Sequence, residues 1–204
     1  MNGSMPATGA IPGLDEEACY RAMSSRDRRF DGRFFVGVRT TGVYCRPVCP
    51  ARTPARKNVA FYGCAAAASE AGFRPCLRCR PETAPGSPAW HGTSATVARA
   101  LRCIGSGALD ADSVAHLASR LGIGERHLRR LFLDHLGATP VAVAQTRRLH
   151  LAKQLLDETD LAMTRIAFDA GFGSLRRFNT AVRSAYGRNP SELRRRHPSS
   201  RLPT

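Results

Sequence analysis

The sequence predicts a chain of two unlike parts: a small α+β domain followed by an all-α domain built from two copies of one helical unit. Six of the seven cysteines precede residues 83–89, a proline- and glycine-rich stretch typical of a linker. After this stretch a glycine-punctuated helical pattern repeats at an offset of 49 to 50 residues. We therefore expect a flexible leader, the first domain, a linker, the helical domain and a tail at residues 1–14, 15–83, 84–96, 97–197 and 198–204.

The charge indicates the class of partner. The chain has 204 residues and a net charge of +15, and Lys57 and Lys153 are its only lysines. Arginine binds phosphate through two hydrogen bonds and can read guanine edges, so this excess points to nucleic acid. A GC-rich genome would also raise the arginine share, but it would not produce the net charge.

Membrane and secretory signals are missing from the sequence. No apolar run approaches the ~18–20 residues that a membrane span needs, and the first residues do not resemble a signal peptide. We therefore expect a cytoplasmic protein with no membrane partner. Cysteines stay reduced in that compartment, where they serve as metal ligands or nucleophiles more often than as disulfides.

The first part contains few residues that can build a core. Residues 34–38 and 58–62 are apolar runs that predict two strands, with a turn at residues 40–42. Residues 65–71 are strong helix formers that stop before Gly72. A domain this small needs an additional source of stability such as a bound metal.

Four cysteines have the spacing of a metal site. Cys45 and Cys49 form a C-x3-C pair, and Cys76 and Cys79 form a C-x2-C pair after 26 intervening residues. Two such pairs predict one tetrahedral all-sulfur site for zinc, with an iron–sulfur cluster as the lesser alternative. Spacing alone favours a structural zinc, although zinc-bound thiolates remain nucleophilic enough to attack an electrophilic carbon. The remaining cysteines lack a close partner and are expected to be small buried apolar residues: Cys19, Cys64 and Cys103.

The second part repeats one motif. Residues 117–122 (LASRLG) match residues 166–171 (IAFDAG), and residues 137–140 (GATP) match residues 187–190 (GRNP). Each copy is an apolar-patterned helix, a glycine turn and an arginine-rich helix, which is the layout of a helix-turn-helix unit. A long helix over residues 140–156 is expected to join the two copies.

The second helix of each copy, over residues 125–135 and 174–185, is expected to lie in the DNA major groove. The candidate base or phosphate contacts are Arg126, His127, Arg129, Arg130, Ser174, Leu175, Arg176, Arg177 and Asn179. The expected core residues of this part are Leu117, Leu121, Leu128, Leu131, Phe132, Ile166, Phe168, Phe172, Phe178 and Val182.

Three stretches of the first part together carry a family resemblance: residues 31–52 (DGRFFVGVRTTGVYCRPVCPAR), 58–62 (NVAFY) and 71–81 (AGFRPCLRCRP). In this order and at this cysteine spacing, they resemble the N-terminal domain of the Ada family of alkylation-response proteins. It implies one zinc ion bound by the four cysteines, with Cys45 accepting a methyl group from a DNA methylphosphotriester. This transfer would reduce the negative charge of the site and tighten DNA binding. The side chains then expected to touch DNA phosphates are Thr41, Arg46, Arg52, Arg74 and Arg78.

The second part resembles the DNA-binding domain of the AraC family, which Ada proteins carry next. The matching stretches are VAHLASRLG, LRRLF, GATP, IAFDAGF and YGRNP, at residues 114–122, 128–132, 137–140, 166–172 and 186–190. The two resemblances together imply a monomeric DNA repair protein and transcriptional activator that works with RNA polymerase at promoters. No Pro-Cys-His-Arg motif is present, so guanine-base repair is not expected. The alternatives are a transcription factor with a purely structural zinc and a thiol redox sensor.

Overall fold

The computed structural model describes residue 11 and residues 14–84 and 95–194. The chain forms two compact units, Met1–Arg147 and Arg148–Thr204. The predicted tail at residues 198–204, nearly all of the predicted leader at residues 1–14 and most of the predicted linker at residues 84–96 lie outside the described residues, so the domain boundaries remain a prediction. None of the described helices combines the length and the hydropathy that crossing a membrane requires.

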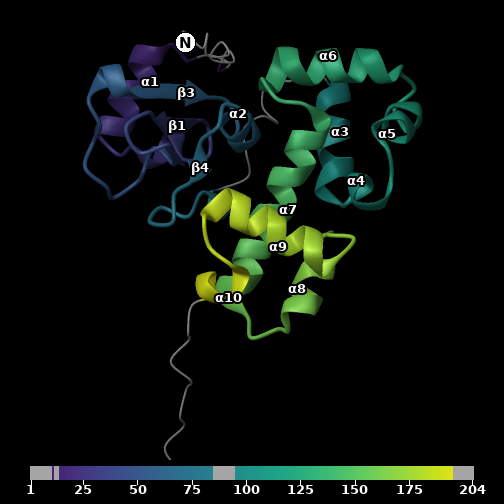
Figure 1. Ribbon diagram of the computed structural model, residues 1–204. Coiled ribbons are helices and arrows are strands. Elements are labelled where there is room, and N and C mark those ends of the chain that lie inside the picture. The colour runs from purple at the N-terminus through teal and green to yellow at the C-terminus, as the bar shows by residue number, and fades with distance from the viewer. Residues whose placement is uncertain (1–10, 12–13, 85–94, 195–204) are drawn as a thin grey trace, which may run out of the picture. The chain divides into compact units, whose positions relative to one another are not determined.

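The N-terminal part of the first unit is a four-stranded sheet with short helices (Figure 1). The strand order is β3-β1-β2-β4, with β1 antiparallel to both β2 and β3, and β2 parallel to β4. The predicted strands and helix are confirmed as β1, β3 and α2. The elements are α1 (Glu16–Ser24), η1 (Arg28–Phe30), β1 (Phe35–Val38), β2 (Val43–Cys45), η2 (Arg56–Asn58), β3 (Val59–Tyr62), α2 (Ala65–Glu70), β4 (Arg74–Pro75) and η3 (Pro81–Thr83).

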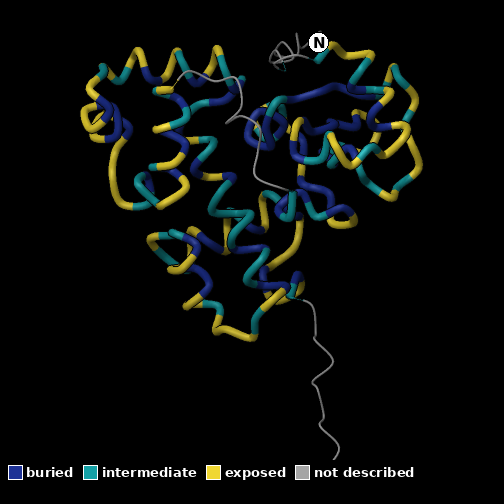
Figure 2. Tube along the Cα trace, turned by 180° about the vertical axis from the view of Figure 1, so that it is seen from behind, coloured by how far each residue is buried: buried dark blue, intermediate teal, exposed yellow. Residues whose placement is uncertain are grey.

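Both faces of this sheet are covered, and β1 and β3 are buried along their whole length (Figure 2). Side chains alternate between the two faces of a strand. Val36 and Phe61 therefore pack with Cys19 of α1 in one apolar core. Phe35 and Tyr62 point the other way and belong to a second core that contains the alanines of α2. The continuous apolar runs in the sequence follow from this two-sided burial.

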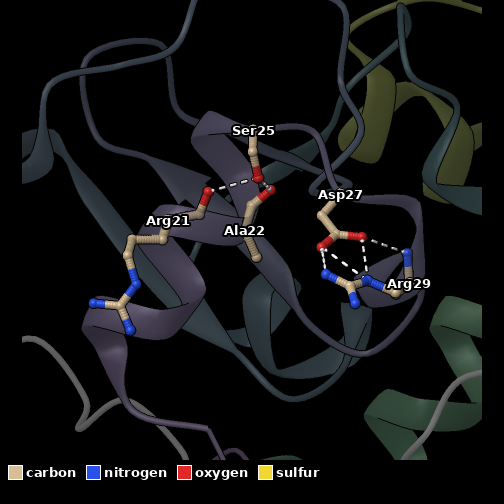
Figure 3. Close-up of polar contacts among 5 residues, drawn as sticks. All are labelled: Arg21, Ala22, Ser25, Asp27 and Arg29. Carbon is tan, nitrogen blue, oxygen red and sulfur yellow. Dashed lines mark hydrogen bonds and ion pairs between the residues drawn. The ribbon is translucent and has the colours of Figure 1, made fainter.

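Polar side chains end α1 and turn the chain toward the sheet (Figure 3). The Ser25 hydroxyl donates to the carbonyl oxygens of Arg21 at 2.9 Å and Ala22 at 3.3 Å, which also accept the backbone N–H groups of Ser25 and Asp27. The Asp27 carboxylate accepts hydrogen bonds from the backbone N–H of Arg29 at 3.0 Å and from its guanidinium at 2.6 Å. This turn forms η1 and leads directly to Asp31, whose contacts are described with the site.

The rest of the first unit contains the first helix-turn-helix copy. Its elements are α3 (Ala95–Gly105), α4 (Ala108–Ala111), α5 (Val114–Arg120), α6 (Glu125–Leu136) and the first part of α7 (Pro140–Glu158). The turn between α5 and α6 passes through Gly122, whose φ of 74° is costly for residues with a Cβ. Leu117, Leu128 and Phe132 are almost fully buried, as expected of the core.

The second unit contains the remainder of α7 and the second copy. Its other elements are α8 (Met163–Asp169), α9 (Leu175–Tyr186) and α10 (Pro190–Leu193). Ile166, Phe178 and Val182 are buried in its core. The expectation that Phe168 is a core residue is wrong, because its side chain is 60% exposed. Phe168 lies two positions after Ile166, and two positions along a helix turn the side chain to nearly the opposite face.

Candidate metal and nucleic-acid site

The sheet brings the two cysteine pairs together. In the parallel pair, Tyr44 of β2 lies opposite Pro75 of β4, so Cys45 and Cys76 are the next residues along each strand. The backbone N–H of Cys76 donates to the Tyr44 carbonyl at 3.0 Å and extends this pairing. The short C-x3-C and C-x2-C turns then return Cys49 and Cys79 to the same place. Strand pairing thus explains how residues about 30 positions apart converge.

The four thiols fit one zinc ion. The sulfur atoms of Cys45, Cys49, Cys76 and Cys79 all lie within 4.8 Å of one another, and three of these residues are buried. Four sulfur donors in one cluster are the ligand set of a closed tetrahedral zinc site. The thiols compete for protons: hydrogen bonding to Cys49 and then to Cys76 raises the pKa of Cys45, whereas hydrogen bonding with Cys45 lowers the pKa of Cys76. A bound dication favours the deprotonated form of all four.

A backbone hydrogen bond reaches one sulfur of the cluster. The Arg46 N–H donates to the Cys79 sulfur at 3.4 Å. A hydrogen bond stabilises a thiolate and lowers its nucleophilicity. Cys79 is therefore weakened as a nucleophile by this contact.

The three cysteines outside the cluster have different surroundings. Cys19 and Cys64 are buried, and burial raises the pKa of each thiol to about 11. The Cys64 thiol also accepts the Ala67 N–H at 3.4 Å and caps α2. Cys103 is partly buried on α3. Cys19 and Cys64 are thus the small apolar residues expected from the sequence, and their thiols stay protonated at neutral pH.

A cavity of about 830 Å³ adjoins the cluster, and it is lined by Cys45, Cys49 and Cys76 but not by Cys79. Thr41, Arg46, Arg52 and Arg78 also line it, which places four of the expected DNA contacts beside Cys45. Arg52, Arg74 and Arg78 are exposed, and their guanidinium groups have no partner among the described residues. The Thr41 hydroxyl is within 3.4 Å of the Val38 carbonyl, to which it donates.

Arg46 differs from the other arginines of the site. Its guanidinium forms an ion pair with the Asp31 carboxylate and also donates to the Thr83 hydroxyl at 2.7 Å and the Cys79 carbonyl at 3.3 Å. Its side chain is only 16% exposed. These contacts leave little of it for phosphate, so the structure favours an internal role over the DNA contact expected from the sequence. No spacing in the sequence predicts that Asp31 and Thr83 contact Arg46, because only the fold brings them together.

The helix-turn-helix candidates lie on the two arginine-rich helices, mostly exposed. On α6, Arg126 has no partner within the described part of the chain, Arg129 pairs with Glu125 at 2.6 Å, and Arg130 donates to Nδ1 of His127 at 3.1 Å. On α9, no described residue pairs with the guanidinium of Arg176 or Arg177, and Asn179 is exposed. Leu175 is partly buried in the second unit's core.

Ser174 has a structural task on α9, where its hydroxyl accepts the Arg177 N–H at 3.2 Å. This hydrogen bond is the N-terminal cap of the helix. It uses the Ser174 hydroxyl oxygen, which the sequence analysis predicts to contact DNA. Whether Ser174 also reaches DNA remains a prediction.

Comparison with known proteins shows which family the chain belongs to. Residues 18–82 match the metal-binding domain of Ada, a zinc-binding domain, and residues 117–196 match a helix-turn-helix domain. The chain is 30% identical over 177 residues to AdaA of Bacillus subtilis, a bifunctional transcriptional activator and DNA repair enzyme, covering 86% of this chain and 81% of AdaA. The chain belongs to the Ada family. Its cofactor is accordingly one zinc ion, for which Cys45, Cys49, Cys76 and Cys79 are positioned.

Another Ada-family relative is longer. The chain is 50% identical over 182 residues to a probable bifunctional transcriptional activator/DNA repair enzyme, AlkA, of Mycobacterium tuberculosis, covering 89% of this chain but 37% of that protein. The chain thus spans little more than a third of this relative. Among solved structures, the C-terminal domain of AraT, a response regulator from Geobacillus stearothermophilus, is 25% identical with a TM-score of 0.50, covering 55% of this chain and 94% of that one. It supports the helix-turn-helix fold of the second part.

Proposed function

We propose that the chain is a single-use DNA methyl acceptor and a transcriptional activator that is switched on by its own methylation. The proposed substrate is a methylphosphotriester in double-stranded DNA, and the proposed acceptor is Cys45. Family membership supports the reaction class. The family resemblance selects Cys45, and the observation that supports this choice is that Cys45 lines the cavity together with Thr41, Arg52 and Arg78, whereas Cys79 does not line it and its sulfur accepts a backbone hydrogen bond.

The reaction is a displacement at carbon. Zinc, when bound by the four cysteines, keeps their sulfurs deprotonated at neutral pH. The Cys45 sulfur attacks the methyl carbon from the side opposite the phosphate oxygen. The sulfur–carbon bond forms as the carbon–oxygen bond breaks, and the bonding electron pair leaves on the oxygen of a phosphodiester anion. The product on the protein is a thioether, which is not a thiolate and does not attack again, so each chain acts once.

Exposed arginines would hold the DNA in place for this step. Arg52 and Arg78 line the same cavity as Cys45, and Arg74 is exposed on β4. Their exposed guanidinium groups can bind the phosphates on either side of the damaged one. The Thr41 hydroxyl lines the cavity as well, and it can donate to a phosphate oxygen by turning its hydrogen away from the Val38 carbonyl.

Methyl transfer would also change the affinity for DNA. Four thiolates and one dication carry roughly −2, and a thioether in place of one thiolate leaves roughly −1. A less negative site repels the DNA backbone less, so the methylated chain should bind more tightly. The helices α6 and α9 would then bind the bases of a promoter in the major groove. The chain would do so as a monomer in the bacterial cytoplasm, where it would recruit RNA polymerase.

Mass spectrometry of the intact protein tests the proposal. We would incubate the zinc-loaded chain with a duplex that carries one methylphosphotriester of defined configuration, and then map the modified peptide. We expect one added methyl group, on the peptide that contains Cys45, and none on Cys45→Ser. Cys103→Ser is the matched control and should be methylated like the wild type. No adduct on a protein that retains zinc would leave only a regulator with a structural metal, and zinc loss with disulfides under peroxide would indicate a redox sensor.

A further inference from the structure

Arg46 connects the two cysteine pairs through its own backbone and side chain. It directly follows Cys45, and its backbone N–H donates to the Cys79 sulfur at 3.4 Å. Its guanidinium donates to the Cys79 carbonyl and to the Thr83 hydroxyl of η3. The residue after one ligand is therefore fixed to the sulfur and the backbone of a ligand in the other pair.

Asp31 completes the arrangement from a third segment. Nε of Arg46 donates to one Asp31 carboxylate oxygen at 2.8 Å, and its NH2 group pairs with the other oxygen. The Asp31 side chain is 9% exposed. A bidentate pair of this kind fixes the plane of the guanidinium as well as its position. The planar fork of arginine suits these three acceptors, and the single ammonium of lysine could not reach all of them in the same geometry.

We propose that Arg46 is a positioning residue for Cys45 and that Asp31 cancels its charge. This inference rests on the proposed function of Cys45. By holding the Cys45–Cys49 turn against Cys79 and Thr83, the guanidinium fixes the direction from which the Cys45 sulfur meets the methyl carbon. Misplacement of a reacting atom by about 1 Å can cost on the order of a hundredfold in rate.

The charges of Arg46 and Asp31 affect the proposed activation of the chain by methylation. An unpaired arginine beside the cluster would offset part of the negative charge that methylation is proposed to reduce. Paired with Asp31, Arg46 adds no net charge at the site, while the exposed Arg52, Arg74 and Arg78 keep their charges for DNA. Arginine thus has two roles in this site. The arginine that lies beside a carboxylate positions the cysteines, and the exposed arginines are available to bind phosphate.

Arg46→Gln, Arg46→Lys and the matched exposed variant Arg52→Gln separate these two tasks. In single-turnover assays, Arg46→Gln should lower the maximal methyl-transfer rate about tenfold or more, and the uncompensated Asp31 carboxylate should raise the DNA concentration at half-maximal rate only about threefold. Arg46→Lys should not restore the rate. Arg52→Gln should raise the half-maximal DNA concentration and reduce the salt slope of binding by about 0.9. If Arg46→Gln reduces the salt slope by about 0.9 and keeps the maximal rate, Arg46 is a phosphate contact and the proposal is wrong.

Two further measurements do not depend on methyl transfer. With cobalt in place of zinc, Arg46→Gln should change the visible absorption of the four-thiolate centre and release the metal to a chelator several-fold faster, whereas Arg52→Gln should do neither. Asp31→Asn should unmask one positive charge and tighten DNA binding of the unmethylated chain about threefold. Wild-type absorption and metal release in Arg46→Gln would overturn the positioning role. A wild-type chain that accepts no methyl while these effects persist would reject the proposed function and leave Arg46 as an organiser of the metal site.

Discussion

The two arginine-rich helices, α6 and α9, are copies with the same frame and different polar faces. Each has twelve residues and ends at a glycine with positive φ, Gly137 and Gly187. Three matched positions face the core at an offset of 50 residues: Leu128, Phe132 and Leu136 on α6, and Phe178, Val182 and Tyr186 on α9. The aromatic rings differ in position but the buried stripe is the same, which is what packing requires of a helix in either copy.

The exposed faces of the two helices have diverged in charge. Arg129 of α6 is paired with Glu125, one turn earlier, but the residues that match them on α9 are Asn179 and Leu175. His127 of α6 matches Arg177 of α9, so this position differs as well. On α9 the guanidinium groups of Arg176 and Arg177 have no partner among the described residues. The comparison indicates that part of the charge of α6 is neutralised within the helix by Glu125, whereas no described carboxylate pairs with Arg176 or Arg177 of α9.

The largest expected effect tests the shared core. Phe132 and Phe178 are both fully buried, so replacement of either by alanine should destabilise its own unit by ~3–5 kcal/mol. Urea denaturation followed by circular dichroism would measure both. If one substitution lowers the free energy of unfolding by less than ~1 kcal/mol while the other lowers it by several, the two helices do not share the same buried core.

The next effect tests the difference in charge. Arg176→Gln combined with Arg177→Gln should reduce the salt slope of DNA binding by ~1.8, because each lost phosphate contact contributes ~0.9, and should weaken binding by more than about tenfold. Arg129→Gln should change the slope by much less, since Glu125 already neutralises this charge. Fluorescence anisotropy at several salt concentrations gives both slopes. Equal losses in the two variants would remove the asymmetry between α6 and α9.

The helix caps provide a smaller test in stability. The Ser174 hydroxyl caps α9, whereas Gly124 at the matching position of α6 makes no side-chain hydrogen bond. Ser174→Ala should cost ~1 kcal/mol, and Gly124→Ser should add a few tenths of a kcal/mol. The backbone of Gly124 is extended, and a Cβ there would meet nothing within 4 Å. Thermal denaturation should show a loss for the first variant and no loss for the second.

The sequence predicts what depends on local pattern and spacing. Cysteine spacing gives the zinc ligands, and the glycine-punctuated repeat gives both helix-turn-helix copies. Phe168 was expected in the core because it is large and apolar, but helical geometry places it on the side away from Ile166. The roles of Arg46 and Asp31 depend on a contact across 15 residues that no periodicity encodes. The family resemblance places Arg46 among the expected phosphate contacts, and its ion pair with Asp31 distinguishes it from the exposed Arg52, Arg74 and Arg78.

The smallest expected effect concerns the ion pair between Glu125 and Arg129, which α6 has and the matching residues of α9 cannot form. Glu125→Gln removes the carboxylate that holds Arg129 at 2.6 Å, so Arg129 should become available to phosphate. We expect the salt slope to rise by ~0.9 and DNA affinity to increase about threefold, because one more counterion is released on binding. Glu125→Gln combined with Arg129→Gln is the control and should return the slope to the wild-type value. If Glu125→Gln weakens binding to one DNA sequence while binding to other sequences is unchanged, Glu125 reads a base directly, and α6 differs from α9 in recognition as well as in charge.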